Sequence, residues 1–459
     1  MSRMPDEPHL RRELGVRDLT LFLIALMVGP RWISVAAHGG PGTIILWILA
    51  ALLFAVPLAI AVATLSAKYP GAGGLYIWAR NDFGPWPGFL NFWVYWLGIA
   101  FLIPGAALFA LGIGVYALGP AYAYLAENHF YMIGGSLLLL WIALGTNLIG
   151  LNIGKWTENL GGAMPWALGL LLCVAATIIG LRHGSATPIN LKSAWPVWNW
   201  DIMNSSAAIA FAMTGMEAAG MMAAEIRDPL RTIPRAAWIS STFVAMFYIV
   251  STLALLVLMA PQNISEMNGL AQVSAAAGAE IGMPWLGSVV VLLVVVNVVG
   301  AFGGLGTSVS RMPFAAGVDH LLPAAFGKIH PRWHTPHVAI LSLGIVATVL
   351  LIACQAGDTV RTAYRTIVDL TVIVGFLPYL YVFASAWKAR KWLSALAGSG
   401  VTLLAIACSI IPPPEVKKVA LFEGKLALGT AAAILSGWLL YRRNNSNRTP
   451  TVREGTIDR

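Results

Sequence analysis

Two charged residues stand alone inside long apolar stretches of the sequence. Arg31 lies in LFLIALMVGPRWISVAAHGGPG, and Glu217 lies in SSAAIAFAMTGMEAAGMMAAEIRDP. A charged side chain at membrane depth is costly unless it is paired or hydrated, and such residues typically mark the path of a substrate or an ion. Nearby opposite charges favour both ionised forms. We therefore expect Arg31 and Glu217 to face one cavity and to interact, directly or through water or substrate.

A residue that interrupts helices stands directly before Arg31, and another stands two positions before Glu217. Gly29 and Pro30 precede the arginine, and Thr214 and Gly215 precede the glutamate. Proline removes a backbone donor and clashes with the preceding turn, and glycine weakens a helix. Irregular backbone at membrane depth is tolerated only inside protein or beside water. These positions predict two broken helices beside a polar cavity.

Two simpler structural interpretations compete with a functional site. A proline kink, with Arg31 snorkelling to the interface, would explain the first stretch, although roughly 20 Å of helix precedes the arginine. Small residues such as Ala218 and Gly220 let helices approach closely and would explain the second stretch. They do not explain the carboxyl group of Glu217. Trp32 would either close over a substrate or pack in the core.

The elements that must position these residues are membrane-spanning helices. The 459 residues are 58% hydrophobic and 11% charged, whereas a soluble domain has roughly 25% charged residues. A helix needs about 20 mostly apolar residues to cross the hydrocarbon core. The sequence therefore predicts an all-α membrane protein with twelve transmembrane helices. Their expected ranges are about 18–38, 43–67, 86–118, 130–153, 161–181, 201–224, 236–259, 285–316, 337–355, 363–387, 393–411 and 419–441.

Lysine and arginine cluster between these helices on one side of the predicted topology. With the N-terminus in the cytoplasm, most of the 29 basic residues lie inside, as the positive-inside rule requires. We expect a multi-pass protein of the inner, cytoplasmic membrane with both termini in the cytoplasm. Residues 1–17 and 444–459 would be tails, and residues 18–443 would form one transporter domain in contact with membrane lipid.

The interrupted helices are the first and the sixth, which suggests an internal repeat. Corresponding Gly/Pro-interrupted segments in two halves of a chain are the best sequence pointer to a transporter site. We expect a five-plus-five inverted repeat with broken helices 1 and 6. Its halves would be residues about 18–181 and 201–388, followed by two extra C-terminal helices at about 393–441.

Four segments resemble motifs of the amino acid–polyamine–organocation (APC) transporters. They are VGPRWI in helix 1, LSAKYPGAGGLYIWARNDFGPWPGF after helix 2, FAMTGMEAAGMMAAEIRDPLRTIPRA in helix 6 and its exit, and SRMPFAAGVDHLLPAAFGKIHPRWHTP after helix 8. The resemblance implies an amino acid permease in which Phe211 occupies the family's aromatic gate position. Within the family, LFAVPLAIAVATL, FLIPGAALFALG, GMEAAGMMAAEIRDP and SIIPPP are most similar to the glutamate/γ-aminobutyrate antiporter branch.

The predicted substrate site combines the helix breaks, the charges and the aromatic residues. Helix N-termini favour anions and exposed carbonyls favour ammonium groups, so we expect free backbone groups at both breaks to hold the carboxylate and the amine of an amino acid. Arg31 favours an acidic substrate, whereas cancellation of its charge by Glu217 would favour a neutral one. The candidate binding residues are Gly29, Pro30, Arg31, Trp32, Phe211, Thr214, Gly215 and Glu217.

The sequence thus predicts a secondary active transporter of amino acids that works by alternating access. The lysine that proton-coupled members of the family often carry in helix 5 is absent from residues 161–181, so exchange is favoured over proton symport. A non-transporting membrane sensor on the same fold is one alternative. A transporter of polyamines or other amines is the second.

No sequence pattern predicts a catalytic, cofactor-dependent or nucleic-acid function. No nucleophile–base pair stands at one depth for an enzyme, and no nucleotide-binding motif surrounds the glycines. Prolines interrupt the segment that carries His330, His334 and His337, so we expect no metal site there. Basic residues are not gathered on one face, as a nucleic-acid partner would require. We expect a monomer or homodimer without a cofactor.

Overall fold

The computed structural model describes residues 14–71, 73–197, 200–355, 360–411 and 419–446. Its regular elements are helices, and the described residues contain in addition one isolated β-bridge, between Leu14 and Ile226. The all-α prediction is therefore confirmed. In chain order the elements are α1 (Val16–Met27), α2 (Arg31–His38), α3 (Thr43–Ala50), η1 (Ala51–Ala55), α4 (Val56–Lys68), α5 (Leu75–Phe83), α6 (Pro85–Leu118), η2 (Pro120–Glu127), α7 (His129–Ile149), α8 (Leu151–His183), α9 (Leu191–Ala194), α10 (Trp200–Ala212), α11 (Ala218–Met221), η3 (Ala223–Glu225), α12 (Pro229–Leu258), η4 (Pro261–Asn263), α13 (Gly269–Glu280), α14 (Leu286–Val309), α15 (Arg311–Val318), η5 (Ala324–Gly327), α16 (His337–Gln355), α17 (Val360–Lys388), α18 (Trp392–Ile410) and α19 (Val419–Ser446).

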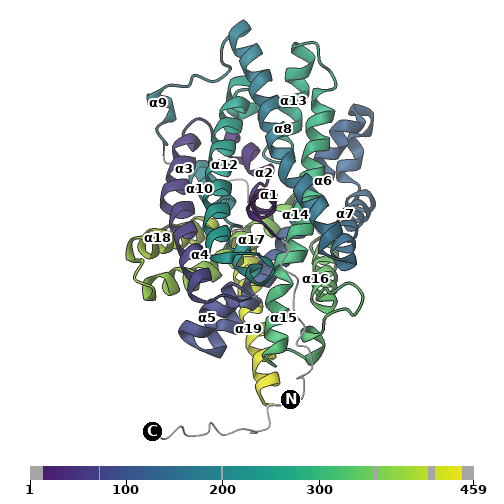
Figure 1. Ribbon diagram of the computed structural model, residues 1–459. Coiled ribbons are helices and arrows are strands. Elements are labelled where there is room, and N and C mark those ends of the chain that lie inside the picture. The colour runs from purple at the N-terminus through teal and green to yellow at the C-terminus, as the bar shows by residue number, and fades with distance from the viewer. Residues whose placement is uncertain (1–13, 72, 198–199, 356–359, 412–418, 447–459) are drawn as a thin grey trace, which may run out of the picture.

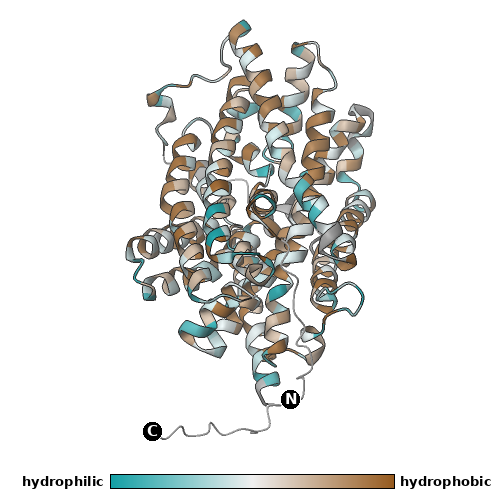
Figure 2. Cartoon of the chain, viewed as in Figure 1, coloured by the Kyte–Doolittle hydropathy of each residue, from teal (hydrophilic) through white to brown (hydrophobic). Residues whose placement is uncertain are grey.

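The long helices contain apolar stretches of membrane-spanning length. Within the described residues, nine helices are long and apolar enough to cross a membrane, or ten if the bent pair α1–α2 is one span. Hydrophobic residues dominate these helices in Figure 2, and Leu52, Leu138 and Leu428 are more than half exposed. Exposed apolar surface on this scale indicates a lipid environment. The chain is therefore a multi-pass membrane protein, while the count of twelve spans stays a prediction.

The first span is broken where the sequence predicts it. Helices α1 and α2 meet at 48°, and Val28 between them has extended backbone with ψ 104°. Figure 1 shows both helices in the middle of the bundle, where α1 packs against α8, α12 and α14. The sixth predicted helix is also interrupted, because α10 ends at Ala212 and α11 begins only at Ala218.

Glycine pairs bring the surrounding helices close together. A Cβ atom built on Gly161 of α8 would lie 2.7 Å from the Cα atom of Gly300 on α14, and one built on Gly98 of α6 would lie 3.1 Å from the Cα atom of Gly375 on α17. Asn297 of α14 also donates its side-chain amide to the Gly161 carbonyl at 3.1 Å. Small residues at helix crossings allow this backbone approach in membranes.

Several helix boundaries differ from the predicted ones. Helix α8 begins at Leu151, not near residue 161, because Gly150 turns the chain with φ +129° and lets a new helix start at once. Lys155 and Glu158 therefore lie within α8. Helix α12 begins at Pro229, since proline is tolerated in the first turn. The short helices α5 and α13 were not predicted; they lie near opposite ends of the bundle in Figure 1.

Candidate functional site

A cavity of about 90 Å³ lies between the two helix breaks. That volume is enough for several water molecules. Its walls come from the α1–α2 and α10–α11 breaks and from α6, α14 and α17. The structure places all eight sequence-predicted residues on these walls: Gly29, Pro30, Arg31, Trp32, Phe211, Thr214, Gly215 and Glu217.

The break in the first span is closed by a tyrosine from α12. The Gly29 N–H donates to the Tyr248 hydroxyl at 2.8 Å, and that hydroxyl donates to the Met27 carbonyl at 2.9 Å. Trp47 stacks on the Tyr248 ring with 4.3 Å between ring centres and so holds the ring in place. One side chain thus satisfies a donor and an acceptor that the helix interruption exposes.

In this structure two of the backbone N–H groups at residues 29–32 already have partners, and the expectation that free backbone groups of this break hold a substrate stays a prediction. The Gly29 N–H is engaged by Tyr248, and the Trp32 N–H donates to the Gly29 carbonyl at 3.0 Å. Pro30 has no N–H to offer. The guanidinium of Arg31 is therefore the stronger positive feature of this wall, and its carbon atom lies 4.0 Å from the centre of the Trp32 ring.

The break in the sixth span depends on a glycine. Gly215 has φ +113°, which side chains other than glycine rarely adopt. A Cβ atom there would lie 3.0 Å from Cγ of Met27, so the two breaks touch at this point. Within the described chain, the carbonyl oxygens of Met213 and Thr214 accept no hydrogen bond. Of these two residues, Thr214 lines the cavity, so its carbonyl oxygen is the one available to an ammonium group.

Glu217 is 1% exposed and is held by neutral donors. Its Oε1 atom accepts from the hydroxyls of Tyr95 and Tyr379, both at 2.7 Å. The Gly215 N–H donates to Oε2 at 2.9 Å. The carboxyl group therefore links the α10–α11 break to α6 and α17. Among the ion pairs of the described residues, none joins Glu217 to Arg31. Both side chains line the same cavity, so an interaction through water or substrate stays a prediction.

Aromatic rings form one side of the cavity. Trp32 and Phe211 meet edge to face with 6.0 Å between their centres, and Phe211 meets Phe376 in the same way at 5.4 Å. Phe211 also fills the space that a side chain at Gly375 would occupy, since a Cβ atom there would lie 2.8 Å from its ring. Edge-to-face pairs of this kind stabilise a fixed ring arrangement.

Sequence reasoning missed the three tyrosines of the site. Tyr95, Tyr248 and Tyr379 lie in apolar helices, where a tyrosine resembles any other large core residue. Their hydroxyls are nevertheless the hydrogen-bond partners of the two breaks. The sequence nevertheless contained a usable indication. Buried tyrosine hydroxyls need hydrogen-bond partners, and so do the backbone groups exposed at the predicted breaks and the carboxyl group of Glu217.

We expect Gly215→Ala to destabilise the protein by about 1–3 kcal/mol, because the positive φ would strain any other residue and the new methyl group would crowd Met27. The matched control is Gly134→Ala, at an exposed helical glycine of α7 where no atom lies within 4 Å of the place a methyl group would take. That change should be neutral or stabilising by up to about 1 kcal/mol. Thermal unfolding of the purified variants measures both, and equal effects would contradict the proposed strain.

Sequence comparisons relate the chain to known transporters. A family model described as amino acid permease matches residues 14–444. An uncharacterized transporter of Legionella pneumophila is 24% identical over 459 residues, covering 95% of this chain and 98% of that protein. The large neutral amino acids transporter small subunit 2 of Mus musculus is 24% identical over 390 residues, covering 81% of this chain and 68% of that protein.

A solved structure shares the fold. The crystal structure of MhsT in complex with L-phenylalanine superposes with a TM-score of 0.60 at 14% identity. The superposition covers 94% of this chain and 100% of MhsT. At this level of identity the likeness concerns the fold.

Proposed function

Because the chain belongs to the amino acid permease family, whose matched relatives are named as transporters, we propose that it carries amino acids across the cytoplasmic membrane by alternating access. The observation that carries this proposal is the cavity between two broken helices, with one guanidinium and one carboxyl group on its walls. Broken helices around a mid-membrane site are typical of secondary transporters.

The two ends of an amino acid find complementary groups in the cavity. The open carbonyl oxygen of Thr214 suits the ammonium group. The carboxylate would lie toward Arg31, at the start of α2, where the helix N-terminus adds to the positive potential. Trp32 and Phe211 would contact the side chain of the substrate. This geometry accommodates an acidic or a neutral amino acid, and we retain the glutamate/γ-aminobutyrate antiporter branch as the proposed subgroup.

The proposed architecture has twelve spans in two inverted halves. The nine long helices, the bent pair α1–α2, the interrupted pair α10–α11 and the shorter apolar α16 supply that number. The end of the bundle that carries α5 and α15 would face the cytoplasm, with both chain termini, because the basic residues favour this orientation. Alternating access would follow from one group of helices rocking against the rest.

We propose exchange of one amino acid for another as the transport mode. Apart from Lys155 near its start, α8 contains no lysine, so the usual helix-5 ammonium group is missing. The rival functions are proton symport, transport of polyamines or other amines, and sensing without transport.

Reconstituted liposomes distinguish these functions. The probes are labelled L-glutamate, L-leucine, L-phenylalanine, L-lysine and putrescine, each offered to liposomes with and without internal unlabelled amino acids. We expect uptake of at least one amino acid, stimulated by at least about tenfold when the liposomes are preloaded. Uptake into empty liposomes driven by a pH gradient alone would contradict exchange. Uptake of putrescine alone would support amine transport, and no uptake of any probe would support a sensor.

A further inference from the structure

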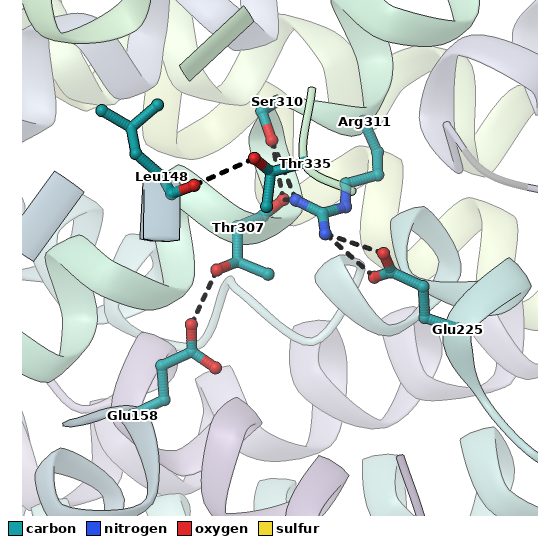
Figure 3. Close-up of polar contacts among 7 residues, drawn as sticks. All are labelled: Leu148, Glu158, Glu225, Thr307, Ser310, Arg311 and Thr335. Atoms are coloured by element: carbon teal, nitrogen blue, oxygen red, sulfur yellow. Dashed lines mark hydrogen bonds and ion pairs between the residues drawn. The ribbon is translucent and has the colours of Figure 1, made fainter. Parts of the chain in front are cut away.

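A second buried polar cluster lies outside the cavity, near the end of the bundle that carries α15 (Figure 3). Four helical segments contribute to it: Glu158 from α8, Thr307 from α14, Glu225 from η3 and Arg311 from α15. None of these residues lines the cavity described above. All four side chains are at least nine-tenths buried. The cluster therefore needs its own explanation.

The arginine of the cluster is committed to one of the two carboxylates. Nη2 of Arg311 donates to both Glu225 oxygens, at 2.8 and 3.1 Å. Its Nη1 donates to the Thr307 carbonyl and, at 3.0 Å, to the Ser310 hydroxyl. Figure 3 shows the guanidinium turned toward these partners, with Glu158 on the far side of Thr307. The positive charge is thus matched by Glu225.

Glu158 has a single neutral donor. The Thr307 hydroxyl donates to its Oε1 atom at 2.7 Å, and the residue is 2% exposed. Within the described chain, no cationic group forms an ion pair with it. Two carboxylates and one guanidinium leave one negative charge unmatched in a buried site, which is costly. A bound proton removes that charge.

An unpaired acceptor lies beside the same carboxyl group. Asn147 of α7 donates its Nδ2 hydrogen to the Gly303 carbonyl, which fixes the orientation of the amide. Its Oδ1 atom has no hydrogen-bond partner, and the residue is 3% exposed. A Cβ atom built on Gly154 would lie 2.6 Å from this oxygen and 3.6 Å from Oε1 of Glu158. The oxygen lacks a donor, and a protonated carboxyl group has one to give, directly or through one water.

We propose that Glu158 is a proton-binding site of the transport cycle. The carboxyl group is protonated while α7, α8, α14 and η3 are packed together as in this structure, and it releases the proton to water on the cytoplasmic side when this end of the bundle opens. In exchange the proton binds and leaves on the same side, so it confers dependence on cytoplasmic pH without net proton transport. This inference rests on the proposed alternating access.

The surroundings of Glu158 leave the proton no competing base or cation. Arg311 and Glu225 are the charged groups that act on Glu158, and they form an ion pair with each other. On α1, Asp18 contacts the neighbouring Asn159 at 3.5 Å. Lys155 precedes Glu158 by three residues on the same helix, and within the described part of the chain the two form no ion pair.

An infrared titration of the full-length protein in detergent tests proton binding without a substrate. Between about pH 5 and about pH 9, the absorption of protonated carboxyl groups should lose a component that is absent in Glu158→Gln. The matched control, Glu423→Gln, changes an exposed glutamate of α19 and should keep that component. Thr307→Val removes a donor to the ionised form, so the titration midpoint of the same component should move to higher pH.

Exchange in liposomes provides the second readout, with whichever probe amino acid the wild-type protein exchanges. Wild-type exchange should change by up to about tenfold per unit of internal pH, and Glu158→Gln should retain exchange with a change below about twofold. An infrared component that is unaltered by Glu158→Gln would overturn the proposal, as would stimulation by sodium without proton binding. Absence of wild-type exchange would instead count against the proposed function, because the infrared result does not depend on transport.

Discussion

Replacing Glu217 by alanine is expected to lower the free energy of unfolding by about 3–5 kcal/mol and to reduce transport by at least about tenfold. The hydroxyls of Tyr95 and Tyr379 and the Gly215 N–H would lose their acceptor, and each orphaned buried donor costs about 1–3 kcal/mol. Transport would fall because the carboxyl group holds the α10–α11 break in position, and small misplacements in a binding site have large effects on rate.

Glu217→Gln is the matched variant for this prediction. Its amide oxygen can still accept from the two tyrosines, so most of the stability should return. Transport should stay low if the charge of Glu217 contacts the substrate, and should recover if the residue serves only to fix the break. Unfolding in detergent and exchange in liposomes measure the two effects separately. A fully stable Glu217→Ala protein would contradict the role assigned to the hydrogen bonds.

Combining Glu217→Ala with Arg31→Ala then tests whether both residues act on one substrate. The hydrogen bonds of Glu217 go to other groups, so the losses of stability should add to within about 0.5 kcal/mol. From the sequence we expect an interaction that is direct or mediated by water or substrate, and additive losses of stability would exclude only the direct form. The losses of transport should not multiply, because both residues line the same cavity. Strictly multiplicative losses would show that they serve different steps.

Local chemistry made much of the cavity predictable. Pro30 and Gly215 cannot continue a regular helix without cost, and Arg31 cannot face lipid. These rules hold whatever the rest of the chain does, so they located both breaks from sequence alone. Family membership was predictable for a related reason: the breaks and the helix exits occur in a characteristic order, and the family match over residues 14–444 confirms it.

The partners of the breaks could not be predicted, because they come from distant helices. Tyr248 lies 219 residues from Gly29, and Tyr379 lies 162 residues from Glu217. Nothing in an apolar segment shows which tyrosine will meet which exposed backbone group. Glu158 was missed for a more local reason: the helix was expected to start near residue 161, so this glutamate was placed outside it. The turn at Gly150 brings it into the bundle.

Breaking the buried ion pair between Arg311 and Glu225 is the second large effect that we expect. Arg311→Leu or Glu225→Leu alone should cost about 3–5 kcal/mol of unfolding free energy, because each leaves the other charge buried without its partner. The double variant should be less damaging than either single one. The exposed pair of Arg231 and Asp228, 3.9 Å apart, is the matched control, and Arg231→Leu should cost less than about 1 kcal/mol.

The same pair should also control how one end of the bundle opens. Leu14 forms two backbone hydrogen bonds with the residues that flank Ile226. Its N–H donates to the Glu225 carbonyl, and its carbonyl accepts from the Arg227 N–H, each at 3.1 Å. Segment η3 is therefore held by the chain before α1 on one side and by Arg311 of α15 on the other. Loss of the ion pair removes one of the restraints on η3. A cysteine introduced at the buried position Ala223 should therefore react with a water-soluble thiol reagent several-fold faster in Arg311→Leu than in Arg231→Leu. Equal rates would show that the ion pair stabilises the protein without restraining η3.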